Sequence, residues 1–191
     1  MTEKLKMLFW GMLAALGALA LESVALIFVT PLSAVAAPAA PAWFMPIGVF
    51  IEELFSLLLI GKLLQNSSDK KNIFTRALCF GLGFALPEIL LNFADNPRLS
   101  QEILLSYLGL LLIHSATAGI FGYYFSKKIG FRAVIFFFFL LALFTHLAFN
   151  LLVLFSLSFW LILGLPLFVI FLCFLALKMP PAKASLPSQK N

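Results

Sequence analysis

In the stretch FIEELFS (residues 50–56), two adjacent glutamates, Glu52 and Glu53, stand in the middle of an apolar run. The run extends from about residue 43 to residue 64, which is long enough to cross a bilayer as a helix that rises about 1.5 Å per residue. A charged side chain at the centre of such a helix costs at least about 2.5–3.5 kcal/mol on insertion scales. We therefore expect both carboxylates to face a polar interior that other helices complete.

The composition excludes an ordinary soluble domain. The chain has 191 residues, of which 63% are hydrophobic and 11% charged. These values predict an all-α, polytopic protein whose residues 1–191 form a single membrane domain in contact with the lipid bilayer. The net charge of +5 comes from basic residues in short loops, so we expect no nucleic-acid partner. The two cysteines, Cys79 and Cys173, fall inside apolar spans and are expected to be core residues.

Six apolar runs predict a six-transmembrane-helix bundle. The predicted spans cover about residues 7–29, 43–64, 73–94, 99–126, 133–155 and 159–177. Residues 34–36 offer a small-residue cleavage pattern, but the first run is longer than the apolar core of a signal peptide, so we expect this span to be retained. Residues 31–41 are a loop rich in proline and alanine, and the polar tail at residues 180–191 is predicted to be disordered.

The basic residues predict the orientation. Twelve of the 13 lysines and arginines fall on one side of the six-span arrangement, which leaves Arg98 on the other side. By the positive-inside rule, we expect both termini to be cytoplasmic. The twelve are Lys4, Lys6, Lys62, Lys70, Lys71, Arg76, Lys127, Lys128, Arg132, Lys178, Lys183 and Lys190.

Four polar residues are predicted to lie at a common depth. Counted from the nearest basic residue at the end of each span, Glu52, Glu88, His114 and His146 lie 10, 12, 13 and 14 residues along four different helices. These counts correspond to depths of roughly 15–21 Å. The coincidence favours one shared buried site. Glu22 has no partner that the sequence identifies, and we place it outside this site.

Helical spacing refines the arrangement. His146 and Asn150 share one helix face, and the small residues Ala118 and Gly122 follow His114 on another, where a neighbouring backbone can approach closely. The two adjacent glutamates are about 100° apart around their helix, so we expect one to face the centre and the other to bond sideways to a neighbouring helix.

These motifs resemble a known family. The glutamate pair is followed by GLGFALPE (residues 81–88), by His114 with Gly119 and Gly122, and by HLAFN (residues 146–150). In this order they resemble the PrsW-type intramembrane proteases, relatives of the CAAX prenyl endopeptidases and of the bacteriocin-immunity-type CAAX proteases. The resemblance covers about residues 43–157. PrsW-type sequences carry lysine where this chain has Ser56, and CAAX relatives carry arginine where it has Leu57.

The resemblance implies an intramembrane endopeptidase, a hydrolase of the bacterial or archaeal cytoplasmic membrane. Its substrate would be a transmembrane or lipid-anchored protein, cleaved by an activated water. One carboxylate of the glutamate pair would be the general base, assisted by His114. His146 and Asn150 would donate hydrogen bonds to the oxyanion, and Glu88 would orient a histidine or the water.

Three alternatives use the same residues differently. In a metalloprotease variant, His114, His146 and Glu88 would be the ligands of Zn²⁺ with Glu53 as the base, whereas the glutamate mechanism needs no cofactor. A catalytically inactive member that lacks the family lysine or arginine would act as a membrane scaffold or a partner-binding subunit. A small transporter or proton relay would use the carboxylates and histidines as a chain.

Overall fold

The computed structural model describes residues 2–29, 42–64, 72–95, 97, 100–127, 132–155 and 159–178. Over these residues the chain forms six long helices, one 3-10 turn and no strand, which confirms the predicted all-α class. Each helix agrees with a predicted span to within a few residues. The elements are α1 (Glu3–Val29), η2 (Ala42–Phe44), α2 (Met45–Leu64), α3 (Ile73–Asp95), α4 (Gln101–Lys127), α5 (Arg132–Leu154) and α6 (Phe159–Lys178).

Five of these helices, α1 and α3 to α6, are long and apolar enough to cross a membrane. The remaining helix, α2, has 20 residues, but three of them are charged, namely Glu52, Glu53 and Lys62. The helix that carries the glutamate pair is therefore the one long helix that is not among the five candidate spans of the described residues. Its place in the bundle depends on what surrounds it.

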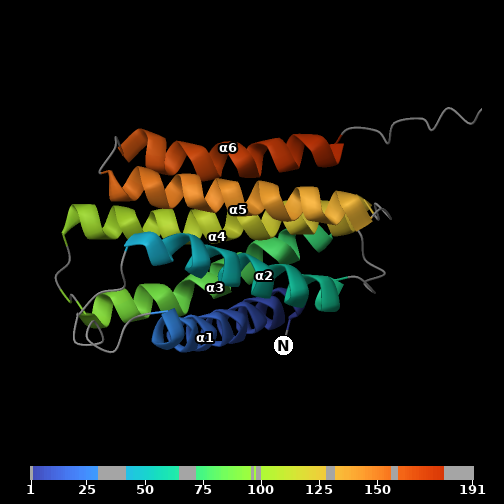
Figure 1. The fold of residues 1–191 in the computed structure, drawn as a ribbon. Helices are drawn as coiled ribbons and strands as arrows, with labels where there is room; N and C mark the ends of the chain where they lie inside the picture. The colour runs from blue at the N-terminus through green and yellow to red at the C-terminus, as the bar shows by residue number, and fades with distance from the viewer. Residues whose placement is uncertain are drawn as a thin grey trace, which may run out of the picture.

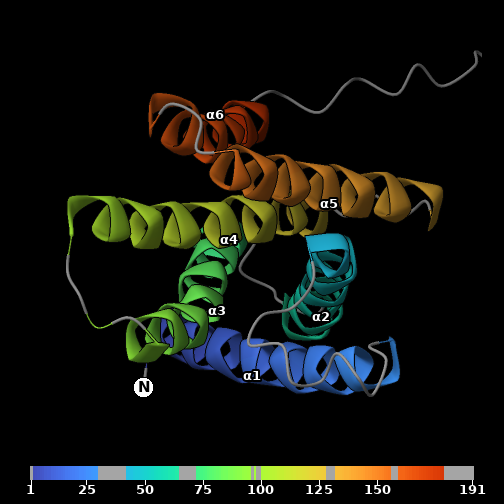
Figure 2. The same cartoon turned by 60° about the vertical axis from the view of Figure 1, so that its left-hand side comes forward.

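The helices are arranged in layers around α2 and α3. Figures 1 and 2 show α1 on one side of this pair, α4 and α5 on the other, and α6 outermost beyond them. The packing agrees, since α3 contacts both α1 and α4, α2 contacts α1, α4 and α5, and α6 contacts α4 and α5. The two helices that supply Glu52, Glu53 and Glu88 thus lie inside the bundle, whereas α6 is the least buried of the five apolar helices.

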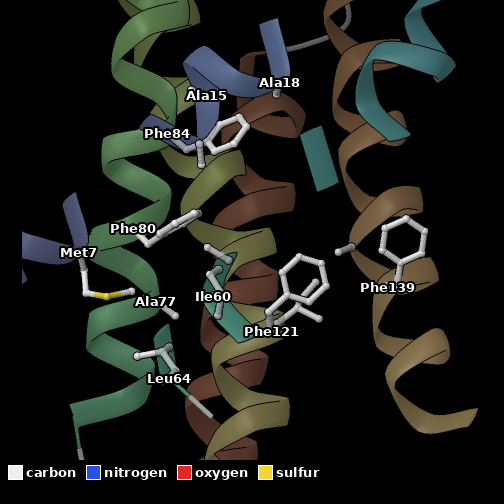
Figure 3. Close-up of a cluster of buried hydrophobic side chains, with 14 of the residues drawn as sticks. Met7, Ala15, Ala18, Ile60, Leu64, Ala77, Phe80, Phe84, Phe121 and Phe139 are labelled. Carbon is white, nitrogen blue, oxygen red and sulfur yellow. The ribbon is translucent and has the colours of Figure 1, made fainter. Parts of the chain in front are cut away.

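The main apolar core lies along the inner faces of α1 to α5. Figure 3 shows part of it, with Phe84 of α3 near Ala15 of α1, Phe80 one turn away on α3, and Phe121 of α4 beside Ile60 of α2. A smaller cluster of Leu110, Ile113 and Phe149 joins α4 to α5. Both clusters border the helix positions that carry the polar residues, so the polar site is enclosed by apolar packing.

Glycines allow α1 and α3 to pack backbone against backbone. A side-chain carbon added to Gly11 of α1 would collide with the Phe80 carbonyl, and one added to Gly83 of α3 would collide with the Leu8 carbonyl. Only residues without a Cβ permit this approach. Pro87 lies inside the same α3 helix, and Figure 2 shows α3 bending along its course, as an internal proline predicts.

The start of α1 and the end of α6 lie at the same end of the bundle (Figure 1). At this end Arg76 of α3 pairs with Glu3 of α1 at 3.9 Å, and Lys127 of α4 donates to the Leu177 carbonyl of α6 at 3.4 Å. We call it the basic end. The predictions for the loop at 31–41, for Arg98 and for the tail at 180–191 fall outside the described residues.

Candidate functional site

The structure brings five of the six predicted site residues into direct contact with one another. They come from four helices, α2 to α5, and all lie in the interior of the bundle. The four helices are therefore rotated so that residues predicted to lie at a common depth also face one another. The five are Glu52, Glu53, Glu88, His114 and His146.

His146 lies against both members of the glutamate pair. Its Nδ1 is 2.8 Å from Glu53 Oε1, a hydrogen bond, and 3.6 Å from Glu52 Oε2, a charge contact. Glu53 is fully buried, and His146 is 2% exposed. An ionised carboxylate only accepts hydrogen bonds, so Nδ1 carries the proton when Glu53 is charged. This pair joins α2 to α5 and fixes the orientation of the His146 ring.

Glu53 retains one unsatisfied atom. Its Oε2 is buried and has no hydrogen-bond partner among the described residues. Buried carboxylate oxygens are almost always hydrogen-bonded, to protein or to ordered water. The orphaned oxygen therefore marks a position where a proton, a water or a bound ligand completes the site.

A second histidine–carboxylate pair joins α3 to α4. His114 Nε2 lies 2.9 Å from Glu88 Oε2, and the His114 side chain is 2% exposed whereas that of Glu88 is 32% exposed. The Phe84 ring, one turn before Glu88, packs on the His114 ring with centroids 4.9 Å apart. The carboxylate therefore orients the His114 ring from one side while an aromatic face supports it from the other.

A glycine makes the second pair possible. A side-chain carbon on Gly81 would collide with the His114 carbonyl and lie 2.6 Å from the Ser115 Cα, closer than non-bonded atoms can approach. Gly122, one of the small residues predicted to admit a neighbour, meets Ala77 of α3 in the same way. Close approach of α3 and α4 therefore sets the distance between Glu88 and His114.

The two pairs meet through their imidazole rings. The rings of His114 and His146 are 4.9 Å apart between centroids and nearly perpendicular, at 86°. Each ring has one nitrogen at a carboxylate, which leaves Nδ1 of His114 and Nε2 of His146 as the second nitrogens. The centre of the site is thus two imidazoles, each positioned by its own glutamate, with the Glu52 carboxylate at their edge.

One ligand atom from each of Glu52, His114 and His146 lies within 4.8 Å of the others, a grouping that could hold a metal ion. The ligand set predicted from the sequence contained Glu88 in place of Glu52. In the structure Glu88 instead bonds to a ring nitrogen of His114. Two imidazoles and one carboxylate form the donor set of many catalytic zinc sites, and a second carboxylate that bonds a ligating histidine is their usual support. The residues present therefore fit Zn²⁺.

Asn150 lies one turn after His146 on α5, in the wall of a cavity of about 300 Å³ that Glu88 also lines. It belongs to this cavity rather than to the cluster of imidazoles. Ser56, at the position of the family lysine, is 5% exposed and lies one turn after Glu52. His146 is the basic group that the structure places against both glutamates of the pair.

Glu22 of α1 was placed outside the site by the sequence analysis, and the structure places it at the border of the site. Its carboxyl carbon is 3.7 Å from the position that a side-chain carbon on Gly48 of α2 would occupy. Gly48 lies one turn before Glu52 on α2, and the buried Oε1 of Glu22 has no hydrogen-bond partner among the described residues. The signal in the sequence was the small-residue stripe Gly11, Ala14, Ala15 and Ala18, which Glu22 continues at a spacing of four.

Comparisons with protein-family models, with curated proteins and with solved structures found no match to this chain.

Proposed function

We propose that the chain is a multi-pass protein of a bacterial or archaeal cytoplasmic membrane, with six spans and both ends in the cytoplasm, and that it is an intramembrane endopeptidase. The proposal rests on the contact between two histidine–glutamate pairs from four helices, in which the centroids of the two histidine rings are 4.9 Å apart. Ionisable groups inside a membrane domain are costly and usually functional. Two such pairs that share one centre support chemistry better than scattered polar contacts do.

The geometry supports different roles for the two adjacent glutamates. Glu53 is fully buried and bonded to His146, so it is suited to orient that ring. Glu52 is 16% exposed, contacts His146 at 3.6 Å and lies within reach of His114. A general base must reach the attacking water. We therefore assign the base to Glu52 and a positioning role to Glu53.

The roles of the other residues follow from which nitrogen of each histidine ring is bonded to a carboxylate. Glu88 accepts from or shares a proton with Nε2 of His114 and so orients this ring toward the centre. In its doubly protonated form, His146 would donate from Nε2 to the oxyanion that forms when water attacks the peptide carbonyl. The proton taken by the base would pass to the leaving amine. If Zn²⁺ were bound by Glu52, His114 and His146, Glu52 would be a ligand rather than the base, and the metal would supply an activated water.

A membrane scaffold is the second candidate function. It is favoured by Ser56 and Leu57 at the two positions where the resembling families carry a cation. In a scaffold, the bonds from α2 to α5 and from α3 to α4 would only hold helices together.

Cleavage of single-span peptides by the purified protein in liposomes tests the proposal. We expect Glu52→Gln to lower the rate about 10²–10⁴-fold, because the general base is lost, with little change in thermal stability. Glu3→Gln is the matched control, since Glu3 is an exposed acid at the basic end whose side chain is 56% exposed. A chelator would remove activity only if zinc supplies the water.

Absence of cleavage by the unmodified protein, or cleavage that Glu52→Gln leaves unchanged, would contradict the proposal. Loss of stability in Glu53→Gln without any cleavage by the unmodified protein would favour the scaffold.

A further inference from the structure

The cavity beside Glu88 lies at the end of the bundle away from the basic end. Its lining comes from the second halves of α3 and α5 and from the first parts of α2 and α4. Those are the helix segments opposite Lys62, Arg76 and Lys127. We call it the distal cavity. Its volume is about 300 Å³.

One face of each of three helices lines the distal cavity. Glu88 and Asn92 are one turn apart on α3, and Asn150 is a polar residue that α5 contributes. Ser106 is the polar residue that α4 contributes, one turn before the buried Leu110. Polar residues on these three faces therefore converge on the same space, although α3, α4 and α5 are otherwise among the apolar helices.

Glu88 connects the distal cavity to the imidazole cluster. One of its oxygens, Oε2, holds His114 at 2.9 Å, and the side chain is 32% exposed because its other side borders the cavity. A molecule in the distal cavity would thus contact the outer side of the pair whose inner side faces His146. The other carboxylate bonded to a histidine, Glu53, has no exposed surface.

The chemistry of the lining favours a peptide over a lipid chain. Asparagine and serine side chains both donate and accept hydrogen bonds. An extended peptide carries one unpaired N–H and one unpaired C=O per residue, and each needs a partner where water is scarce. An acyl chain needs none. Between the polar groups, Met45, Phe149 and Val153 provide apolar surface for side chains.

We propose that the distal cavity binds an extended segment of a peptide substrate, which enters from the end of the bundle opposite the basic end. Asn92 and Ser106 form hydrogen bonds with the backbone groups of this segment. Glu88 lies where the cavity meets the imidazole cluster, so the segment reaches the cluster beside it. This inference rests on the proposed function, because the peptide bond would be hydrolysed at that cluster.

Cysteine labelling tests access without requiring cleavage. Cys79 and Cys173, both free, are replaced by alanine, and Ser106→Cys is introduced as a near-isosteric probe. A thiol reacts with a membrane-impermeant maleimide as a thiolate, which needs water. We expect Ser106→Cys to react at least about tenfold faster than Leu108→Cys, which lies on the same helix and is 42% exposed on an apolar face.

The side of entry has an internal control. Thr2→Cys lies at the basic end, directly before α1. In vesicles of one orientation, we expect Ser106→Cys and Thr2→Cys to react from opposite sides of the membrane. Equal rates for Ser106→Cys and Leu108→Cys, or labelling of Ser106→Cys from the side that labels Thr2→Cys, would overturn the proposal. Unchanged melting of each variant excludes misfolding.

Protection of Ser106→Cys from labelling identifies the kind of molecule that binds in the distal cavity. A peptide with an apolar span of about 20 residues followed by a Gly-Ser segment should slow the labelling of Ser106→Cys, whereas lysophosphatidylcholine should not. Protection by the lipid alone would overturn a peptide site. Protection by the peptide without cleavage by the unmodified protein would support peptide binding in the distal cavity and contradict the proposed endopeptidase activity. Cleavage without protection would refute the cavity alone.

Discussion

The two histidine–glutamate pairs are chemically alike and differ in their surroundings. His146 and Glu53 are almost completely buried, with exposed fractions of 2% and 0%, whereas Glu88 beside His114 is 32% exposed toward the distal cavity. A buried charge whose partner is removed has no water to replace it, but a partly exposed one does. If the distal cavity binds a peptide as proposed, Glu88 of the pair between α3 and α4 contacts it directly, whereas Glu53 of the pair between α2 and α5 only holds His146 in place.

The largest expected effect is on the closed pair. Glu53→Ala should lower the free energy of unfolding in detergent micelles by about 3–5 kcal/mol, because it leaves His146 buried without its acceptor. His146→Ala in the same background should cost much less than it does alone, since the interaction is already lost. Additive losses in this double-mutant cycle would show that the two residues are not coupled.

An intermediate effect is expected where α3 approaches α4. Gly81→Ala should cost about 1–3 kcal/mol, because the added methyl group meets the His114 backbone, which cannot move aside as a side chain would. Gly164→Ala on α6 is the control, since nothing lies within 4 Å of its added carbon. It should be neutral or stabilising by up to about 1 kcal/mol. Equal costs in thermal unfolding would contradict this account of helix spacing.

The smallest effect on stability is expected at the open pair. Glu88→Ala should lower the free energy of unfolding by about 1 kcal/mol, because water from the distal cavity can solvate His114 in its place. Its effect on peptide cleavage should be larger than its effect on stability. A stability loss as large as that of Glu53→Ala, measured under the same conditions, would remove the distinction between the two pairs.

The depth of the site could be predicted from the sequence because it depends only on helix rise and on the basic residues at the helix ends. Glu52, Glu88, His114 and His146 were assigned to one layer in this way, and they do meet. The pairing could not be predicted, because rotation depends on the neighbouring helices. Which carboxylate of the adjacent pair would be fully buried was therefore left open until the contact of α2 with α5 was known.

Glu22 was missed for a related reason. A single glutamate in an apolar helix can face any of several helices, and only the direction of the small-residue face of α1 decides which one it faces. The packing of Gly11 and Gly83 sets this direction. Helix rotation also explains why the candidate metal ligands differ from the predicted set. The rotation of α2 brings Glu52 close to both histidines, whereas Glu88 is hydrogen-bonded to His114.

The close backbone packing of α1 and α3 at Gly11 and Gly83 makes α1 a part of the core. Four residues of α1, Met7, Ala14, Ala15 and Ala18, belong to the buried core of the bundle. A signal peptidase that cut at residues 34–36 would remove this helix from the mature chain and uncover the backbone of α3 at Gly83. Loss of α1 would therefore expose backbone of α3 that is now covered and would remove four side chains from the core.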